Sequence, residues 1–215
     1  MRLILVRHGE SEWNAEGRIQ GQASGNPLTA AGIAQASSAA DSLVGCGATR
    51  LFSSDLTRAR QTADTIASRL QLGVTEEPAL REQAAGELEG RLAAELSLLP
   101  TPPGAHVNDV RWGGGESIAD VHARLRGWLD RLLADIDVRT DPDADTGAGA
   151  GADTGAGADR TRRDGSVIVV SHGIALQVLR AVLAGRGPHD VTWDSLSNGE
   201  VLAVEFEPAT WSGPN

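Results

Sequence analysis

Near its start the sequence reads Leu3-Ile4-Leu5-Val6, and this apolar run leads directly into Arg7-His8-Gly9-Glu10-Ser11. Four consecutive apolar residues are typical of a strand that is buried on both faces. A second run, Val167-Ile168-Val169-Val170, leads in the same way into Ser171-His172-Gly173. Ligands of open α/β sheets bind beyond the carboxyl ends of parallel strands, so we expect His8 and His172 to meet at one edge of one sheet.

Two histidines and an arginine at such an edge suit a phosphoryl group. A phosphate needs fixed cationic donors, and covalent transfer needs a neutral imidazole as nucleophile. The alternative is that both histidines are ordinary hydrogen-bonded residues at strand ends, with no chemistry. The pairing of two similar strand-to-histidine segments favours a phosphate site.

The composition limits the class of protein. The 215 residues suffice for a single domain, residues 1–215, and we expect no second one. With Cys46 as the single cysteine, no intramolecular disulfide can form, and no Cys/His cluster of metal-binding spacing is evident. A formal net charge of -10 argues against nucleic-acid or anionic-membrane partners. The apolar run at residues 3–6 is too short for a signal peptide or a membrane span, so we expect a cytoplasmic protein.

Strand and helix patterns alternate along the chain. After the strand at residues 3–6, we expect strands at 50–54, near 73–75, at 167–170 and at 201–206. We expect helices at 30–43, 56–70, 88–99, from Ser117 onward and at 174–183. Thr29 and Asp55 are the expected N-caps of the first two helices. This alternation predicts an α/β fold, a three-layer α/β/α sandwich with a mostly parallel central sheet. Residues 140–164 are rich in Gly, Ala and Asp, and we expect a flexible surface loop there.

Several motifs, in a fixed order, resemble those of the histidine phosphatase superfamily in its phosphoglycerate-mutase-like branch. They are Leu5 to Asn14 with Gly17 to Gly21 and Asn26 to Gly32, Ser53 to Ala63, Leu80-Arg81-Glu82 with Gly86 and Glu89-Gly90, Gly114-Gly115-Glu116-Ser117, and Ser171-His172-Gly173, with Asn198 a weaker echo. The matches span residues 3 to 173. A lone Arg-His-Gly is weak evidence, whereas five ordered motifs are strong.

The resemblance implies a role for each matching residue. His8 is expected to be the nucleophile, with one ring nitrogen held by a hydrogen bond that fixes the tautomer. Arg7, Arg58, His172 and Asn14 are expected to bind the phosphoryl oxygens, and Glu82 to act as the general acid and then the general base. No cofactor and no metal are expected.

Some of these assignments have alternatives in the sequence. Glu87 and Glu89 lie close to Glu82, and a charged loop residue is usually only solvated. Gln20 and Gly21 either line the pocket or serve a turn. Of the neighbouring arginines Arg58 and Arg60, one must be an exposed helix residue, and we assign that place to Arg60. His106, His122 and His189 match no motif and are expected at the surface or in packing.

The activity divides between two members of the same superfamily. We expect a phosphatase, a phosphomonoesterase acting on a small phosphorylated metabolite, and the alternative is a 2,3-bisphosphoglycerate-dependent phosphoglycerate mutase. The mutases carry a tyrosine and a lysine in and just after the acid loop, and this sequence contains neither residue type. A small helical cap insertion at residues 88–115 is expected to set specificity. A binding module without catalysis is a further alternative, and the oligomeric state, including a homodimer, is left open.

Overall fold

A five-stranded sheet forms the centre of the molecule. The computed structural model describes residues 1–96, 100–140, 165–208 and 211. The strands are β1 (Arg2–Arg7), β2 (Ala48–Ser53), β3 (Val74–Glu76), β4 (Ser166–Ser171) and β5 (Val201–Glu205), in the order β3-β2-β4-β1-β5. All neighbours are parallel except β5, which pairs antiparallel with β1 at the edge. The predicted mostly parallel sheet is therefore confirmed.

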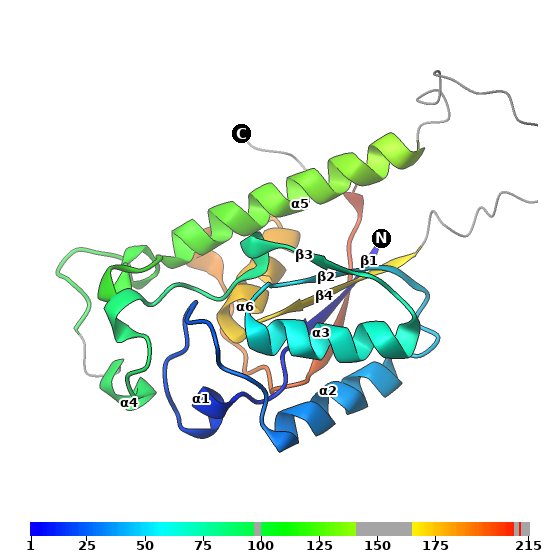
Figure 1. The fold of residues 1–215 in the computed structure, drawn as a ribbon. Helices are drawn as coiled ribbons and strands as arrows, with labels where there is room; N and C mark the ends of the chain where they lie inside the picture. The colour runs from blue at the N-terminus through cyan, green and yellow to red at the C-terminus, as the bar shows by residue number, and fades with distance from the viewer. Residues whose placement is uncertain (97–99, 141–164, 209–210, 212–215) are drawn as a thin grey trace, which may run out of the picture.

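Helices cover both faces of this sheet (Figure 1). Helices α2 (Ala30–Ser42) and α3 (Thr57–Leu70) lie on one face, and α5 (Ile118–Thr140) and α6 (Gly173–Leu183) lie on the other. Because side chains alternate along a strand, Ile4 and Val6 enter the core under α2 and α3, whereas Leu3 and Leu5 enter the core under α5 and α6. This is the three-layer α/β/α sandwich that the sequence predicts.

Two of the expected helix caps are present. The Thr29 hydroxyl accepts a hydrogen bond from the Gly32 N–H at 3.0 Å and so begins α2. The Ser117 hydroxyl accepts from the Asp120 N–H at 3.1 Å, while the Asp120 carboxylate accepts from the Ser117 N–H at 2.8 Å. Helix α5 therefore begins directly after Ser117, as expected.

The cap expected from Asp55 was wrong. The N-cap of α3 is Leu56, and no side chain closes that turn. The Asp55 carboxylate instead accepts hydrogen bonds from Arg81, with its Oδ1 at 2.7 Å from Nε. The charged partner competes successfully because a paired, charge-assisted hydrogen bond is stronger than a neutral cap.

The helix expected at residues 88–99 is also wrong over the described residues. The segment contains only the 3-10 turn η2 (Gly86–Leu88) and the short helix α4 (Ala93–Leu96), and residues 97–99 lie outside the described part. Part of its backbone bonds to residues 17–19: Ile19 N–H donates to the Arg91 carbonyl, and Gly90 N–H donates to the Ile19 carbonyl, both at 2.8 Å.

The remaining elements are short. They are α1 (Glu12–Ala15), η1 (Pro78–Leu80), η3 (Val107–Asp109), η4 (Trp112–Gly114) and η6 (Pro188–Asp190). The loop expected at 140–164 falls outside the described residues from 141 on, and Thr140 is the last residue of α5. Within the part of the chain that the structure describes, no helix has the length and apolarity needed to cross a membrane.

Candidate active site

His8 lies directly after β1, buried, with its ring held in one orientation. Its Nδ1 lies 2.6 Å from the Gly9 carbonyl oxygen. Because a carbonyl only accepts, Nδ1 carries the proton and Nε2 keeps its lone pair. Burial, followed by the charge of Arg58, lowers the pKa of His8 well below its usual value, so the ring is neutral and suited to act as a nucleophile.

His172 follows β4 and is the N-cap residue of α6. The ring centroids of His172 and His8 are 5.0 Å apart, because β1 and β4 pair in parallel with Arg7 opposite Ser171. His172 Nε2 lies 2.8 Å from the Ser54 hydroxyl oxygen. Burial, then the charges of Arg58 and His8, lower the pKa of His172 well below its usual value. The structure thus brings the two predicted histidines together.

Arg7 and Arg58 are positioned by backbone carbonyls. Arg58 Nη2 donates to the Gly21 carbonyl at 2.8 Å, and Arg7 Nη1 donates to the Leu196 carbonyl. Burial is the main cause that lowers the pKa of Arg58 to about 10, so its guanidinium is still charged at neutral pH. Burial also lowers the pKa of Arg7.

Within the part of the chain that the structure describes, three buried nitrogens in this group have no hydrogen-bond partner: Arg7 Nε, Arg58 Nε and His172 Nδ1. An unsatisfied buried polar group costs about 1–3 kcal/mol, so such groups are rare without a reason. The two guanidinium Nε–H groups can only donate, and their position near His8 suits a ligand that carries several acceptor oxygens. A phosphoryl group has that chemistry.

Asn14 and Gln20 have their amide oxygens occupied within the protein. Asn14 Oδ1 accepts from the Ser11 N–H at 3.1 Å and from Asn198 Nδ2 at 3.3 Å, and Gln20 Oε1 accepts from the Ser11 hydroxyl at 2.8 Å. The NH₂ groups are therefore what these two side chains offer a ligand. Gly21 contributes through its carbonyl on Arg58 and through a positive φ of 49°.

Glu82 is fixed in place and is more than a solvated loop carboxylate. Its Oε1 accepts from the N–H groups of Gln83 and Ala175 at 3.0 and 3.1 Å, and its Oε2 accepts from the Ile174 N–H at 3.2 Å. Ile174 and Ala175 belong to the first turn of α6, which His172 precedes. The carboxylate and the second histidine are thus held by the same helix end.

Most of these side chains line one pocket of about 240 Å³, whereas His172, fully buried beside the His8 ring, is not part of the lining. Its lining comprises Arg7, His8, Asn14, Arg18, Ile19, Gln20, Gly21, Arg58, Glu82, Gln83, Ala84, Ala85, Leu88, Trp112 and Ile174. Glu87 and Glu89 are not among them. The geometry therefore favours Glu82 as the carboxylate that reaches a ligand.

Sequence reasoning missed four residues, of which two support the site from behind the lining and two belong to the lining. Ser11 is fully buried and joins Asn14 to Gln20, and Ser54 holds the His172 ring. Trp112 and Ile19 belong to the wall. Ser11 and Ser54 lie inside matched motifs and could have been singled out, whereas no sequence signal marks Trp112, since the five tryptophans are scattered.

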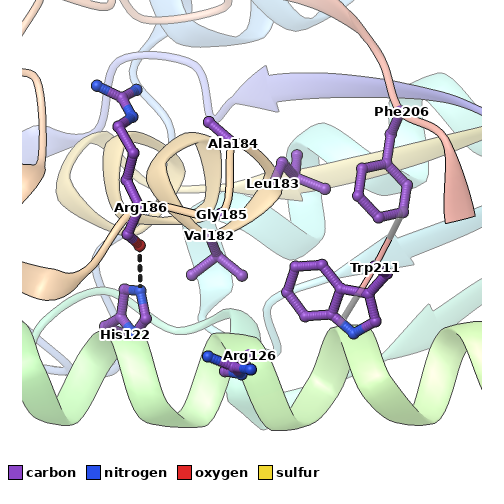
Figure 2. Close-up of a pocket in the computed structure, with 9 residues that line it drawn as sticks. All are labelled: His122, Arg126, Val182, Leu183, Ala184, Gly185, Arg186, Phe206 and Trp211. Atoms are coloured by element: carbon purple, nitrogen blue, oxygen red, sulfur yellow. Dashed lines mark hydrogen bonds between the residues drawn. The ribbon is translucent and has the colours of Figure 1, made fainter. Parts of the chain in front are cut away.

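A second pocket of similar volume lies between α5 and the end of α6 (Figure 2). His122 Nε2 lies 2.9 Å from the Arg186 carbonyl oxygen there, and Phe206 and Trp211 lie at its other end. None of the predicted site residues lines it. The predicted phosphate site therefore lies at the first pocket.

One group of side chains in the described ranges has a composition suited to a metal ion. The candidate ligand atoms of His106, Asp109 and His189 all lie within 4.8 Å of one another, and all three residues are exposed. The rings of His106 and His189 stack at 4.0 Å. The cluster shares no residue with the pocket lining, so it supplies nothing to the chemistry around His8.

Comparison with known proteins gives consistent results. A family model described as the histidine phosphatase superfamily (branch 1) matches residues 3–139. A probable phosphoglycerate mutase GpmB from Proteus mirabilis (strain HI4320) is 33% identical over 220 residues, which covers 98% of this chain and 87% of the relative. A solved mycobacterial glucosyl-3-phosphoglycerate phosphatase in complex with VO3 is 28% identical with a TM-score of 0.74, covering 95% of this chain and 90% of its own. A putative alpha-ribazole-5'-P phosphatase from Escherichia coli K-12 is 26% identical with a TM-score of 0.72, over 94% of this chain and 89% of its own.

Proposed function

Because this chain belongs to the histidine phosphatase superfamily, branch 1, we propose that it hydrolyses phosphate monoesters through a phosphohistidine formed on His8. The membership confirms the resemblance seen in the sequence motifs and the expectation of an enzyme of this superfamily. The observation that carries the proposal is the fixed Nδ1–H tautomer of His8, which leaves Nε2 free to attack beside the unpartnered nitrogens of Arg7, Arg58 and His172.

The reaction proceeds in two displacements. In the first, His8 Nε2 bonds to phosphorus as the ester P–O bond breaks, and the leaving oxygen takes a proton from the Glu82 carboxyl group. In the second, water attacks phosphorus, its proton passes to the Glu82 carboxylate, and the N–P bond breaks to release phosphate. His8 is neutral again and Glu82 is protonated, so the cycle closes without a metal or a cofactor.

The arginines and His172 stabilise the transferring group. Charge develops on the three equatorial oxygens of the phosphoryl group, and preformed donors lower the barrier because they need no reorganisation. Asn14 and Gln20 add amide donors on the same wall of the pocket. The substrate is a small phosphorylated metabolite that enters as a dianion and leaves as an alcohol.

The mutase is the second candidate, because the sequence relatives carry that name. Retention of a phosphoglycerate during transfer needs cations for its carboxylate. The pocket lining contains no lysine or tyrosine. Arg18 is the one arginine of the lining that is not expected to bind the phosphoryl oxygens, and it donates from Nε to the Glu16 carboxylate at 2.5 Å. This charge distribution favours hydrolysis.

Four measurements test the proposal. Wild-type protein is expected to release phosphate from an aryl phosphate, and rapid quenching with ³²P-labelled substrate is expected to trap an acid-labile, alkali-stable adduct that the His8→Ala variant lacks. With 3-phosphoglycerate, phosphate release is expected to exceed isomerisation whether or not 2,3-bisphosphoglycerate is added. Faster isomerisation with the bisphosphate would establish the mutase, and phosphate binding without any turnover would establish a binding module. Activity that chelator removes and a divalent ion restores would contradict the metal-free mechanism.

A further inference from the structure

We infer that the part of the pocket beyond the phosphate donors is an apolar subsite built around Trp112, and that it selects phosphate esters of uncharged alcohols with an apolar or aromatic body. The inference rests on the proposed phosphatase function and deepens it. It concerns the leaving group alone, because the donors around His8 are the same for every phosphate ester.

The wall on this side is apolar. Trp112, Ile19, Leu88 and Ile174 all line the pocket together with His8 and Glu82. Leu88 is buried, and the other three are half-buried, so their side chains are packed yet keep exposed surface. An indole offers a large rigid face at low entropic cost to a ligand that covers it.

Trp112 is held against the acid loop by backbone packing. A Cβ added to Gly113 would lie 2.3 Å from the Ala85 carbonyl oxygen, and one added to Gly115 would lie 2.0 Å from the Ala84 carbonyl oxygen. Both contacts are with backbone, so no side chain can move aside to make room. The Glu116 N–H also donates to the Ala84 carbonyl at 2.8 Å. The 3-10 turn that carries Trp112 and the loop that carries Glu82 therefore form one rigid unit.

The charges around this wall disfavour an anionic leaving group. Arg7 and Arg58 are the arginines proposed to bind the phosphoryl oxygens. Arg18 is paired with Glu16 and also donates to the Gly90 carbonyl at 2.7 Å. The carboxylates next to the loop are used within the protein: Glu89 Oε1 accepts from the Ala85 N–H at 3.1 Å, and Glu116, which pairs with Arg124 at 2.8 Å, accepts from the Ala84 N–H at 2.9 Å. Neither lines the pocket, so the lining leaves only the already paired Arg18 for a carboxylate on the substrate, whereas an apolar group would meet the indole.

The decisive experiment compares esters whose leaving alcohols are all primary, so that leaving-group reactivity differs little. We expect kcat/KM for 2-phenylethyl phosphate to exceed that for glycerol 1-phosphate by roughly tenfold or more, and that for 3-phosphoglycerate to be lower still. In Trp112→Ala, the ratio of kcat/KM for 2-phenylethyl phosphate to that for glycerol 1-phosphate should fall to near one, mainly through a higher KM for the phenylethyl ester. Trp112→Phe should keep most of the preference.

Trp193→Ala is the matched control, because Trp193 is 51% exposed and lies outside the pocket lining. Its kinetics should equal those of wild type with every ester. Equal kcat/KM for 2-phenylethyl and glycerol phosphates in wild type would overturn the subsite and leave the phosphatase standing. If no ester is turned over, the proposed function fails, and competition between benzylphosphonate and methylphosphonate for binding still tests the subsite. Equal affinity for both phosphonates would then refute it.

Discussion

Arg58 and Arg60 lie two positions apart on α3 and have opposite environments. Successive helix residues turn by about 100°, so two positions place side chains on nearly opposite faces. Arg58 is 1% exposed and donates to backbone carbonyls, whereas the Arg60 side chain is 37% exposed and pairs with Asp64 and Glu76. The same residue type is therefore buried at the predicted site on one face of the helix and paired with carboxylates on the other.

Substitution of these two arginines separates the roles. Arg58→Ala is expected to lower kcat/KM for a phosphate ester by roughly 10²–10³, because it removes a fixed donor from the transferring phosphoryl group. Arg58→Lys should also lower kcat/KM substantially, since an ammonium cannot reproduce the hydrogen bonds of the planar guanidinium. Steady-state kinetics on both variants, with folding checked by circular dichroism, makes the measurement. Arg60→Ala is the control and should stay within about twofold of wild type; a comparable loss in Arg60→Ala would contradict the assignment.

Single residues were predictable where their position depends on chain-local features. His8 and His172 could be placed together because both follow buried strands, and strand ends of a parallel sheet share an edge. The environment of Asp55 could not be predicted, because its partner Arg81 lies 26 positions away along the chain. A long-range ion pair leaves no trace in the local pattern. The catalytic roles stay predictions until activity is measured.

At the scale of elements, helix α6 organises the site through its first turn. Its N-cap residue is His172, and the N–H groups of Ile174 and Ala175 hold the Glu82 carboxylate. The positive end of the helix dipole stabilises a negative charge at this point. The acid loop is therefore anchored to the helix that also presents the second histidine.

Glu82→Gln tests whether this anchored carboxylate also moves a proton. We expect kcat for an alkyl phosphate to fall by roughly 10²–10⁴, because the alkoxide then leaves without a proton. An aryl phosphate with a nitrophenol leaving group should fall much less, since that anion leaves unaided. Kinetics with the two ester types gives the comparison. Glu87→Gln, at an exposed position outside the pocket, is the control. An equal loss with both esters would make Glu82 a positioning residue.

Elements were predictable where the pattern of one segment determines its partner. Alternate side chains of β1 enter the hydrophobic cores on the two faces of the sheet. The Thr29 and Ser117 caps mark the starts of α2 and α5. The helix predicted at 88–99 was wrong because Leu and Ala favour a helix locally, whereas part of the backbone of this segment bonds to residues 17–19. Tertiary pairing overrides propensity in this case, and that same pairing builds the wall that carries Leu88 and Ile19.

At the scale of the whole molecule, a cationic pocket is built into a protein with a formal net charge of -10. Positive charge is concentrated by burying Arg7 and Arg58, and the two histidines beside them are kept neutral by the same burial. The fold therefore carries a cost below neutral pH. An unfolded chain can protonate both imidazoles freely, whereas the folded one cannot.

Stability should consequently fall as pH drops below about 6.5. The folded pKa of each histidine is lower than the unfolded one, so the unfolded state binds more protons in this range. Each site then removes up to about 1.4 kcal/mol of unfolding free energy per pH unit, until the folded pKa is reached. Urea denaturation of wild type between pH 7.5 and 5.5, beside a His8→Asn/His172→Asn double variant, isolates the effect from protonation of carboxylates. The double variant should show the flatter dependence. Parallel curves for the two proteins would mean that these imidazoles take up protons in the folded state as readily as in the unfolded chain, and the lowered pKa of the two histidines would have to be abandoned.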